Sequence, residues 1–186
     1  MNIIITGGCG FIGNSIIRNL IKNKNNNILN IDKVTNVSSP ESLKNYSSNN
    51  NYNFKKIDIC NFSKILKVFK SFKPDFVIHA AAESHVDNSI ISPEKSILTN
   101  IIGTYNLLES SRNVPNKNLI FVYISTDEVY GSLKLKEKAF KETNKFFPNS
   151  PYSASKASAE HLVRAWNKTF NLNTIITNCC NNFGPW

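Results

Sequence analysis

A glycine-rich turn near the start of the chain constrains its fold more than any other segment. The turn, Thr6–Gly13, reads TGGCGFIG and holds four of the seven glycines. A β-branched run at Asn2–Thr6 precedes it, and Phe11–Asn23 follows with apolar residues at a helical period. Glycines let a backbone approach a pyrophosphate, which the N-terminus of the next helix attracts. The spacing is G-x-x-G-x-x-G rather than G-x-G-x-x-G, and a tight turn without ligand is the alternative, but the strand–turn–helix context favours dinucleotide binding.

Strand-like and helical segments alternate along the rest of the chain. Thr35–Asn53 is polar without a clear period, which predicts a loop with some irregular helix. Apolar strands alternating with helices indicate a parallel sheet covered on both faces, so we expect a doubly wound, Rossmann-type α/β fold in one domain over residues 1–186. The expected helices are Ser63–Phe72, Pro93–Asn113 and Tyr152–Phe170, and the expected strands are Ile28–Asp32, Asn53–Asp58, Asp75–Ala82, Asn118–Thr126 and Asn173–Asn178.

The composition argues against several other classes of protein. Lys and Arg number 22 against 13 acids, a formal net charge of +9, but the cations are nearly all Lys and are scattered. Nucleic-acid binding favours a cluster that includes Arg, so we expect a solvated basic surface and no nucleic-acid partner. No apolar run is long enough to span a bilayer, and no basic leader follows Met1. Four cysteines are too few for a disulfide scaffold, and three histidines lack ligand spacing. We expect a cytoplasmic protein without a metal site.

Two carboxylates follow predicted strands where a dinucleotide would lie. Asp32 is nineteen residues beyond Gly13, at the end of the second strand. A carboxylate there accepts both hydroxyls of the adenosine ribose and repels a 2′-phosphate, which favours NAD over NADP. Lys33, a cation beside it, is less easily reconciled with this preference. Asp58, followed by Ile59, can reach the adenine amino group or cap the next helix, and the two roles are compatible.

Tyr152 and Lys156 form a Y-x-x-x-K pair at the start of a predicted helix. Residues four apart lie on one helix face, so the ammonium of Lys156 is expected to stabilise a phenolate and lower the pKa of Tyr152. Tyr152 would then act as a base toward a sugar hydroxyl during hydride transfer. The pattern also arises by chance, in which case the pair faces solvent.

Thr126, Asp127 and Glu128 end an apolar strand. Ligands of open α/β sheets lie beyond the carboxyl ends of strands, so these side chains should border the cofactor crevice. Adjacent carboxylates in a cleft can acquire different pKa values, one serving as acid and one as base. The alternative is a polar exit from the strand, with Asp127 as a cap.

Several segments in this order resemble the extended short-chain dehydrogenase/reductase superfamily, and within it the dTDP-glucose 4,6-dehydratase family. The similarity spans the chain, and the Thr-Asp-Glu triplet is its specific signal, because related sugar-nucleotide epimerases generally lack the acid pair. The segments are Gly7–Gly13, Ala80–Asp87, Thr126–Glu128, Tyr152–Lys156 and Asn178–Pro185.

The resemblance implies a mechanism that converts dTDP-glucose to dTDP-4-keto-6-deoxyglucose. Tyr152 would take the 4-hydroxyl proton as hydride passes from C4 to NAD, which is regenerated when hydride returns to C6. Glu128 would remove the C5 proton, and Asp127 would protonate the leaving C6 hydroxyl. Thr126 would contact the sugar 4-oxygen, and Lys156 would hold the nicotinamide ribose. The resemblance places Ser84, Thr126 and Asn181 at the substrate, and Gly7, Gly10, Phe11, Ile12, Gly13, Asp32, Lys33, Thr35, Asp58, Ile59, Ala80, Ala82, Thr99, Tyr152, Lys156 and Asn182 at NAD.

The comparison with the family also marks differences and alternatives. Asn88 replaces the usual Arg after His85-Val86-Asp87. A UDP-sugar epimerase or decarboxylase and a non-catalytic NAD-binding module are the rival functions. In the family a smaller C-terminal domain grips the nucleotide, and we expect it to begin beyond Trp186. We also expect a homodimer, since the helices after Pro93 and Tyr152 commonly pair across a two-fold axis, although they could equally pack within one chain.

Overall fold

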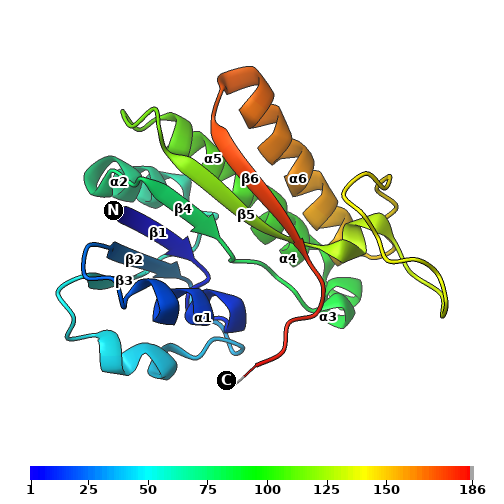
Figure 1. Cartoon of the computed structure of the whole chain (residues 1–186), viewed down its shortest axis with the longest axis horizontal. Coiled ribbons are helices and arrows are strands. Elements are labelled where there is room, and N and C mark those ends of the chain that lie inside the picture. Colours follow the sequence, from blue (N-terminus) through cyan, green and yellow to red (C-terminus); the bar gives the residue numbers. More distant parts are fainter. Residues whose placement is uncertain (185–186) are drawn as a thin grey trace.

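A computed structural model describes residues 1–184 and shows one six-stranded parallel sheet (Figure 1). The strand order is β3-β2-β1-β4-β5-β6, so the chain builds outward from β1 first in one direction and then in the other. That reversal makes a crevice at the carboxyl ends of the strands, where open α/β sheets bind ligands. The strands are β1 (Asn2–Thr6), β2 (Asn27–Asp32), β3 (Tyr52–Lys56), β4 (Phe76–His79), β5 (Ile120–Thr126) and β6 (Asn173–Cys179).

Helices lie on both faces of the sheet, which confirms the doubly wound fold. Alternate residues of β1 face opposite layers: Ile3 and Ile5 pack with Ile17 of α1, whereas Ile4 belongs to the cluster that contains Phe69 of α2. The helices are α1 (Phe11–Leu20), α2 (Phe62–Phe72), α3 (Val86–Ile91), α4 (Pro93–Ser96), α5 (Gly103–Arg112) and α6 (Pro151–Phe170), with 3-10 helices η1 (Pro40–Tyr46) and η3 (Asp127–Tyr130) and a π-helix η2 (Ile97–Ile102).

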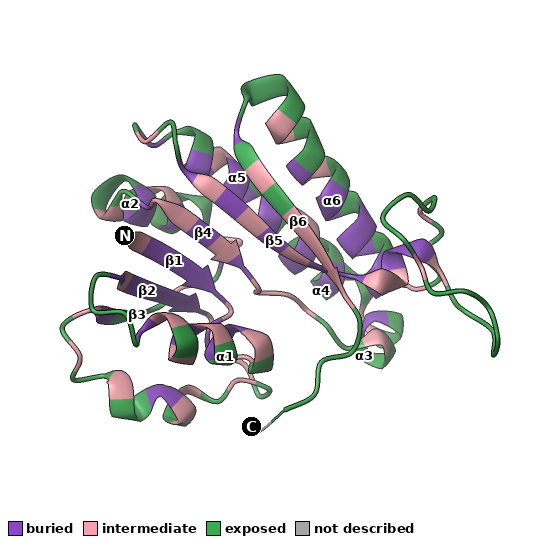
Figure 2. Cartoon of the chain, viewed as in Figure 1, coloured by how far each residue is buried: buried purple, intermediate pink, exposed green. Residues whose placement is uncertain are grey.

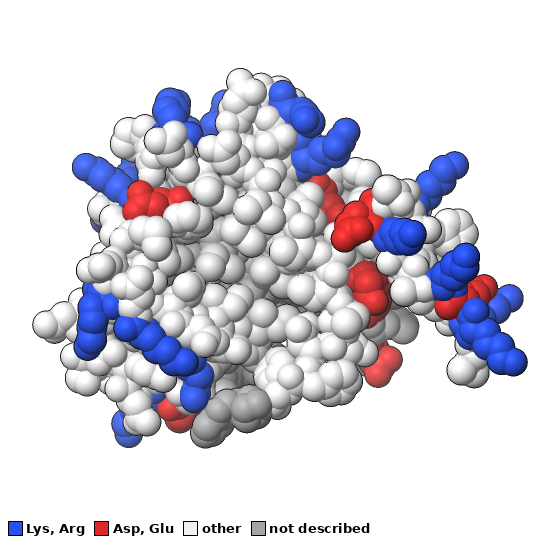
Figure 3. All heavy atoms as spheres, in the orientation of Figure 1, with Lys and Arg blue, Asp and Glu red and all other residues white. Residues whose placement is uncertain are grey.

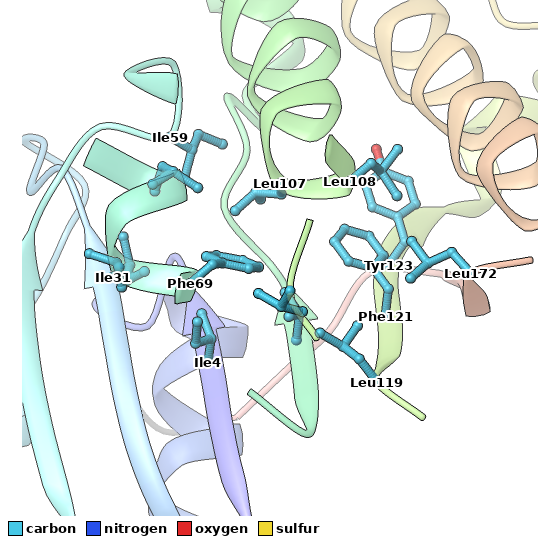
Figure 4. Packing of buried hydrophobic residues seen from close by; sticks show 14 of the residues in the cluster. Ile4, Ile31, Ile59, Phe69, Leu107, Leu108, Leu119, Phe121, Tyr123 and Leu172 are labelled. Carbon is cyan, nitrogen blue, oxygen red and sulfur yellow. The ribbon is translucent and has the colours of Figure 1, made fainter. Parts of the chain in front are cut away.

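The larger part of the core lies between the sheet and the layer of α2, α5 and α6 (Figure 4). Phe69, Leu107, Phe121 and Tyr123 are fully buried there. Burial is deepest in the central strands and falls off toward β6, where Ile175 is 50% exposed (Figure 2). Because α5 and α6 both lie on one face, no described helix covers the other face of β5 and β6 (Figure 1).

The expected elements are present, with three differences. β4 ends at His79 because Ala80–Ala82 leave the sheet to line a cavity. α3 was not expected, since its six residues are too short to show a period. The long helix predicted from Pro93 to Asn113 contains the π-helix η2 between α4 and α5. The irregular helix expected between Thr35 and Asn53 is η1.

Candidate active site

A cavity of about 560 Å³ opens at the carboxyl ends of the strands. The glycine turn lies at one end, and the end of β5 and the start of α6 lie at the other. Of the residues expected at a site, the cavity is lined by Gly7, Gly10, Phe11, Ile12, Gly13, Asp32, Lys33, Thr35, Ile59, Ala80, Ala82, Ser84, Thr99, Thr126, Glu128, Tyr152, Asn181 and Asn182. Asp58, Asp127 and Lys156 do not line it.

The glycine turn brings the N-terminus of α1 against the end of β1. Gly7 adopts a φ of 72°, which side chains disfavour. A Cβ on Gly13 would lie 2.2 Å from the Gly7 oxygen, so only glycine allows α1 to pack this closely. Gly10 precedes the first turn of α1, whose leading N–H groups have no partner within the helix. This close, positively polarised cradle fits a pyrophosphate.

Asp32 is buried at the end of β2 and is fixed by backbone donors. The Cys9 N–H donates to its Oδ2 at 3.0 Å, and the Val34 N–H donates to its Oδ1 at 2.7 Å. Ser38 Oγ also donates to Oδ1 at 3.4 Å, so the remaining acceptor site is on Oδ2, where Asp32 can accept a ribose hydroxyl as its position predicts. Asp58, in contrast, is exposed and accepts the Cys60 N–H at 2.8 Å, in the turn before α2. The side chain that caps α2 is that of Asn61, so the alternative role of Asp58 as the helix cap is wrong.

Tyr152 enters the cavity from the first turn of α6. Pro151 begins that helix, and Ser150 and Ser153 form a reciprocal capping box that fixes where it starts. The Tyr152 N–H also donates to Ser89 Oγ at 3.2 Å, which ties the start of α6 to α3. The position of the tyrosine is therefore set by a rigid helix end.

Lys156 is buried beneath Tyr152 and is directed away from the cavity. Its Nζ donates to the Ile124 carbonyl at 2.7 Å and lies 4.2 Å from the centre of the Tyr123 ring. Burial lowers the pKa of Lys156 to about 7, although the charge of Glu160, one turn along α6, opposes the shift.

The expectation that Lys156 lowers the pKa of Tyr152 is wrong for this structure. Burial and then the charge of Glu128 raise the pKa of Tyr152 to about 12, and a hydrogen bond with Thr126 opposes only part of the rise. Residues on one helix face need not interact, and here Lys156 points to the strand while Glu128 approaches the phenol.

The acid pair has two different environments. Glu128 lines the cavity, and burial followed by the charge of Asp127 raises the pKa of Glu128. Asp127 lies beside the cavity, where Thr126 Oγ1 approaches its Oδ1 at 3.5 Å. Both carboxylates lie in the first turn of η3, which the Thr126 side chain caps.

A polar bridge that the sequence did not reveal joins the ends of β5 and β6 to the middle of α6. Asn178 Nδ2 donates to Glu160 Oε1 at 2.7 Å and to the Thr126 carbonyl at 3.3 Å. Beyond it, Asn181 and Asn182 line the cavity. Pro185, the last residue of the predicted motif, lies outside the described residues. The sequence shows only that Glu160 is a carboxylate on a predicted helix, and its burial is visible only in the structure.

Other cavity residues were also missed. Glu83 lies in a segment assigned to the family motif but had no role, and it bonds to Lys33 across the cavity. Ser38, from the loop after β2, lines the same end of the cavity. Both depend on contacts between distant segments, which a sequence pattern does not specify. Asn88, where the family has Arg, is exposed on α3.

Within the described residues, we find neither a group of metal-ligating side chains nor a helix that could span a membrane. No three His, Cys, Asp or Glu side chains within residues 1–184 form a group that could hold a metal ion. No helix in that range has the length and apolarity to cross a membrane. On the face drawn in Figure 3, Lys and Arg are spread around the rim and do not gather at its centre.

Fold and site together define a class of protein. A doubly wound sheet, a glycine turn at its first crossover and a Tyr-x-x-x-Lys pair on the helix beside the same cavity characterise a short-chain dehydrogenase/reductase domain. The family model described as GDP-mannose 4,6 dehydratase matches residues 4–186, and the chain belongs to that family.

Two curated relatives bear the name dTDP-glucose 4,6-dehydratase. The Salmonella typhimurium protein is 49% identical over 100% of this chain and 56% of its own length. The Neisseria meningitidis serogroup B protein is 48% identical over 99% of this chain and 54% of its own length. The chain thus spans about half the length of these relatives.

Solved structures show the same fold. A double mutant of DesIV, a dTDP-glucose 4,6-dehydratase from Streptomyces venezuelae solved with NAD bound, superposes with a TM-score of 0.92 at 33% identity, covering 100% of this chain and 57% of that one. A UDP-glucose 4-epimerase from Thermotoga maritima superposes with a TM-score of 0.84 at 30% identity, covering 96% of this chain and 55% of that one.

Proposed function

We propose that this chain binds NAD and supplies the catalytic groups of a dTDP-glucose 4,6-dehydratase. The observation that carries the proposal is one cavity with the glycine turn and Asp32 at one end and Thr126, Glu128 and Tyr152 at the other. A single ligand-sized space therefore joins a dinucleotide cradle to groups suited to proton transfer. The names of the relatives supply the sugar nucleotide.

The cofactor role rests on residues whose backbone or side chain faces the cavity. The N–H groups at the start of α1 would hold the pyrophosphate, and Asp32 would accept the ribose hydroxyls. Ile59 and Thr99 line the cavity near that end and would contact the adenosine. Bound NAD would supply the hydride acceptor and donor, and its positively charged nicotinamide ring would favour loss of the Tyr152 proton.

The proton steps fall to three side chains. Tyr152 takes the proton of the sugar 4-hydroxyl, and Thr126 holds the 4-oxygen. Glu128 then removes the C5 proton, for which a carboxylate with a raised pKa is the stronger base. Asp127, in its carboxylic acid form, gives its proton to the departing C6 hydroxyl, which leaves as water. This role requires the side chain to turn toward the cavity from its present place beside it.

Substrate contacts are proposed for two residues at the rim. Ser84 follows β4 and Asn181 follows β6, and both line the cavity. The chain covers 56% of the Salmonella relative. Specificity for the dTDP base is therefore proposed from similarity to the relatives, and we also propose that this chain turns over the substrate.

Two experiments test the proposal. Incubation of the purified chain with NAD and dTDP-glucose should give a 4-keto sugar, detected by its absorbance in alkali. Hydrogen isotope placed at C4 should appear at C6 of the product.

Retention of the label at C4 would favour the epimerase alternative, which the solved neighbours raise and the Asp127/Glu128 pair opposes. A decarboxylase would be recognised by release of carbon dioxide from a UDP-uronic acid. Bound NAD without product would favour a non-catalytic module.

Homodimerisation is proposed from an apolar surface on η2 and α5. Ile97, Leu98, Ile102 and Tyr105 are 48%, 53%, 41% and 41% exposed, and such patches mark association sites. Sedimentation at several concentrations should give a dimer for the unchanged chain and a monomer for Leu98→Glu. A cytoplasmic location is proposed because all four cysteines are free, as expected in a reducing compartment.

A further inference from the structure

A cation lies next to the carboxylate expected to select NAD. Lys33 follows Asp32 directly and lines the same cavity. In dinucleotide-binding folds, a basic side chain near the ribose pairs with the 2′-phosphate of NADP, whereas an acid there favours NAD. Asp32 thus favours NAD, whereas the neighbouring Lys33 would favour NADP. In the structure, Lys33 is paired with another group of the protein.

Lys33 is engaged by Glu83. Its Nζ donates to Glu83 Oε1 at 2.7 Å and lies 3.4 Å from Thr99 Oγ1. The two charged side chains are 31% and 30% exposed, so solvent screens the pair only partly. Burial alone would lower the pKa of Lys33, but the hydrogen bond and charge of Glu83 outweigh it and the pKa of Lys33 is raised.

Hydrogen bonds with Asn100 fix the backbone of Glu83. Asn100, buried in η2, accepts the Glu83 N–H at 2.9 Å and donates to the Glu83 carbonyl at 3.0 Å. The same amide donates to Ser155 Oγ at 2.8 Å on α6. Glu83 therefore has a backbone fixed by two hydrogen bonds, and the ammonium of Lys33 contacts its carboxylate.

We propose that Glu83 is a determinant of cofactor selectivity, because it neutralises Lys33 and so withholds that cation from the 2′-phosphate of NADP. The inference rests on the proposed binding of NAD in this cavity. Asp32 repels the phosphate, and Glu83 removes the group that would otherwise attract it. Selectivity for NAD then depends on two carboxylates from different strand ends, of which only Asp32 has the position usually associated with it.

The test measures the Kd of NAD and of NADP by calorimetry for the full chain and its variants. Glu83→Gln keeps the size of the side chain and frees Lys33. It should tighten NADP binding about fivefold, the scale of one partly screened ion pair, and change NAD binding less than about twofold. The gain should shrink as salt is raised. Asp32→Asn provides a second background, in which NADP binding is stronger to begin with and the same gain should follow.

The matched control is Lys33→Gln, alone and combined with Glu83→Gln. The double variant should lose the gain, because the cation responsible is absent. An unchanged NADP-to-NAD ratio in Glu83→Gln, with NAD still bound and the circular dichroism spectrum unchanged, would overturn the inference and leave the proposed function intact. If Glu83→Gln does not fold, Glu83→Ser provides the same comparison. Failure of the unchanged chain to bind NAD would overturn the proposed function and this inference together.

Discussion

Alanine at Gly13 should separate α1 from the turn that it packs against. In an ordinary helix interior, Gly→Ala stabilises by about 1 kcal/mol. Here the new methyl would lie 2.2 Å from the Gly7 oxygen and 2.8 Å from the Gly7 carbonyl carbon, both backbone atoms that cannot rotate away. Overpacking of this kind costs about 3 kcal/mol at the upper end of its range, so the net loss of stability is about 2 kcal/mol.

The measurement is denaturant and thermal unfolding together with NAD binding. A loss of about 2 kcal/mol lowers the Tm of a chain this size by about 4–8 °C. NAD affinity should fall at the same time, because the displaced turn is the proposed pyrophosphate cradle. The result expected for this substitution is therefore a double loss, of stability and of cofactor.

Two other glycines provide matched controls. A Cβ on Gly10 would lie 3.3 Å from the Gly7 oxygen, a tight contact without overlap, so Gly10→Ala should cost less stability than Gly13→Ala. A Cβ on Gly103 would lie 2.5 Å from Ile59 Cδ1, the movable end of a side chain, so Gly103→Ala should fall between the two. If Gly13→Ala were as stable as the unchanged chain and still bound NAD, the close-packing argument would be refuted.

Three further predictions concern the charges of Lys156, Glu160 and Glu128. Because the pKa of Lys156 falls from 10.5 to about 7 on folding, the unfolded chain binds the extra proton between those values and stability should rise with pH there. Lys156→Met should remove that rise in pH-dependent unfolding, and an unchanged slope would contradict the lowered pKa. Glu160→Gln removes the charge that supports the Lys156 ammonium, so the rise should begin at a lower pH; a later onset would argue against that coupling. Glu128→Gln should leave NAD affinity unchanged and cut formation of the 4-keto product at least about 100-fold, and product at the normal rate would exclude Glu128 as the base.

The main elements at both ends of the cavity could be predicted because local patterns determine them. The glycine turn, Asp32 and the start of α6 each lie where a strand ends or a helix begins, and such junctions are visible as changes of period in the sequence. These elements then lie close together because the carboxyl ends of parallel strands meet at one edge of the sheet.

The electrostatic details could not be predicted in the same way. Lys33 and Glu83 are fifty residues apart, and their contact depends on how the loop after β4 is anchored by Asn100. The spacing of Tyr152 and Lys156 correctly placed both on α6, but it could not say that the lysine would turn to a strand carbonyl. The surrounding packing determines the direction of a side chain. That direction determines which charges lie near it, and so whether its pKa is raised or lowered.

The π-helix has a consequence for how this site can be lost. A π turn holds one residue more than the α-helix around it, and each residue of an α-helix advances by roughly 100°. Removing a single residue after Asn100 within η2 would restore regular pitch and turn either the preceding or the following part of the helix by about that angle. If the preceding part turned, Thr99 would leave the cavity and Asn100 would lose its hydrogen bonds to the backbone of Glu83, while Ile97 and Leu98, now exposed, would turn inward. Such a gap of one residue keeps every side chain proposed for catalysis yet disconnects the loop after β4, so a deletion in η2 can disable the site as a substitution of a catalytic side chain does.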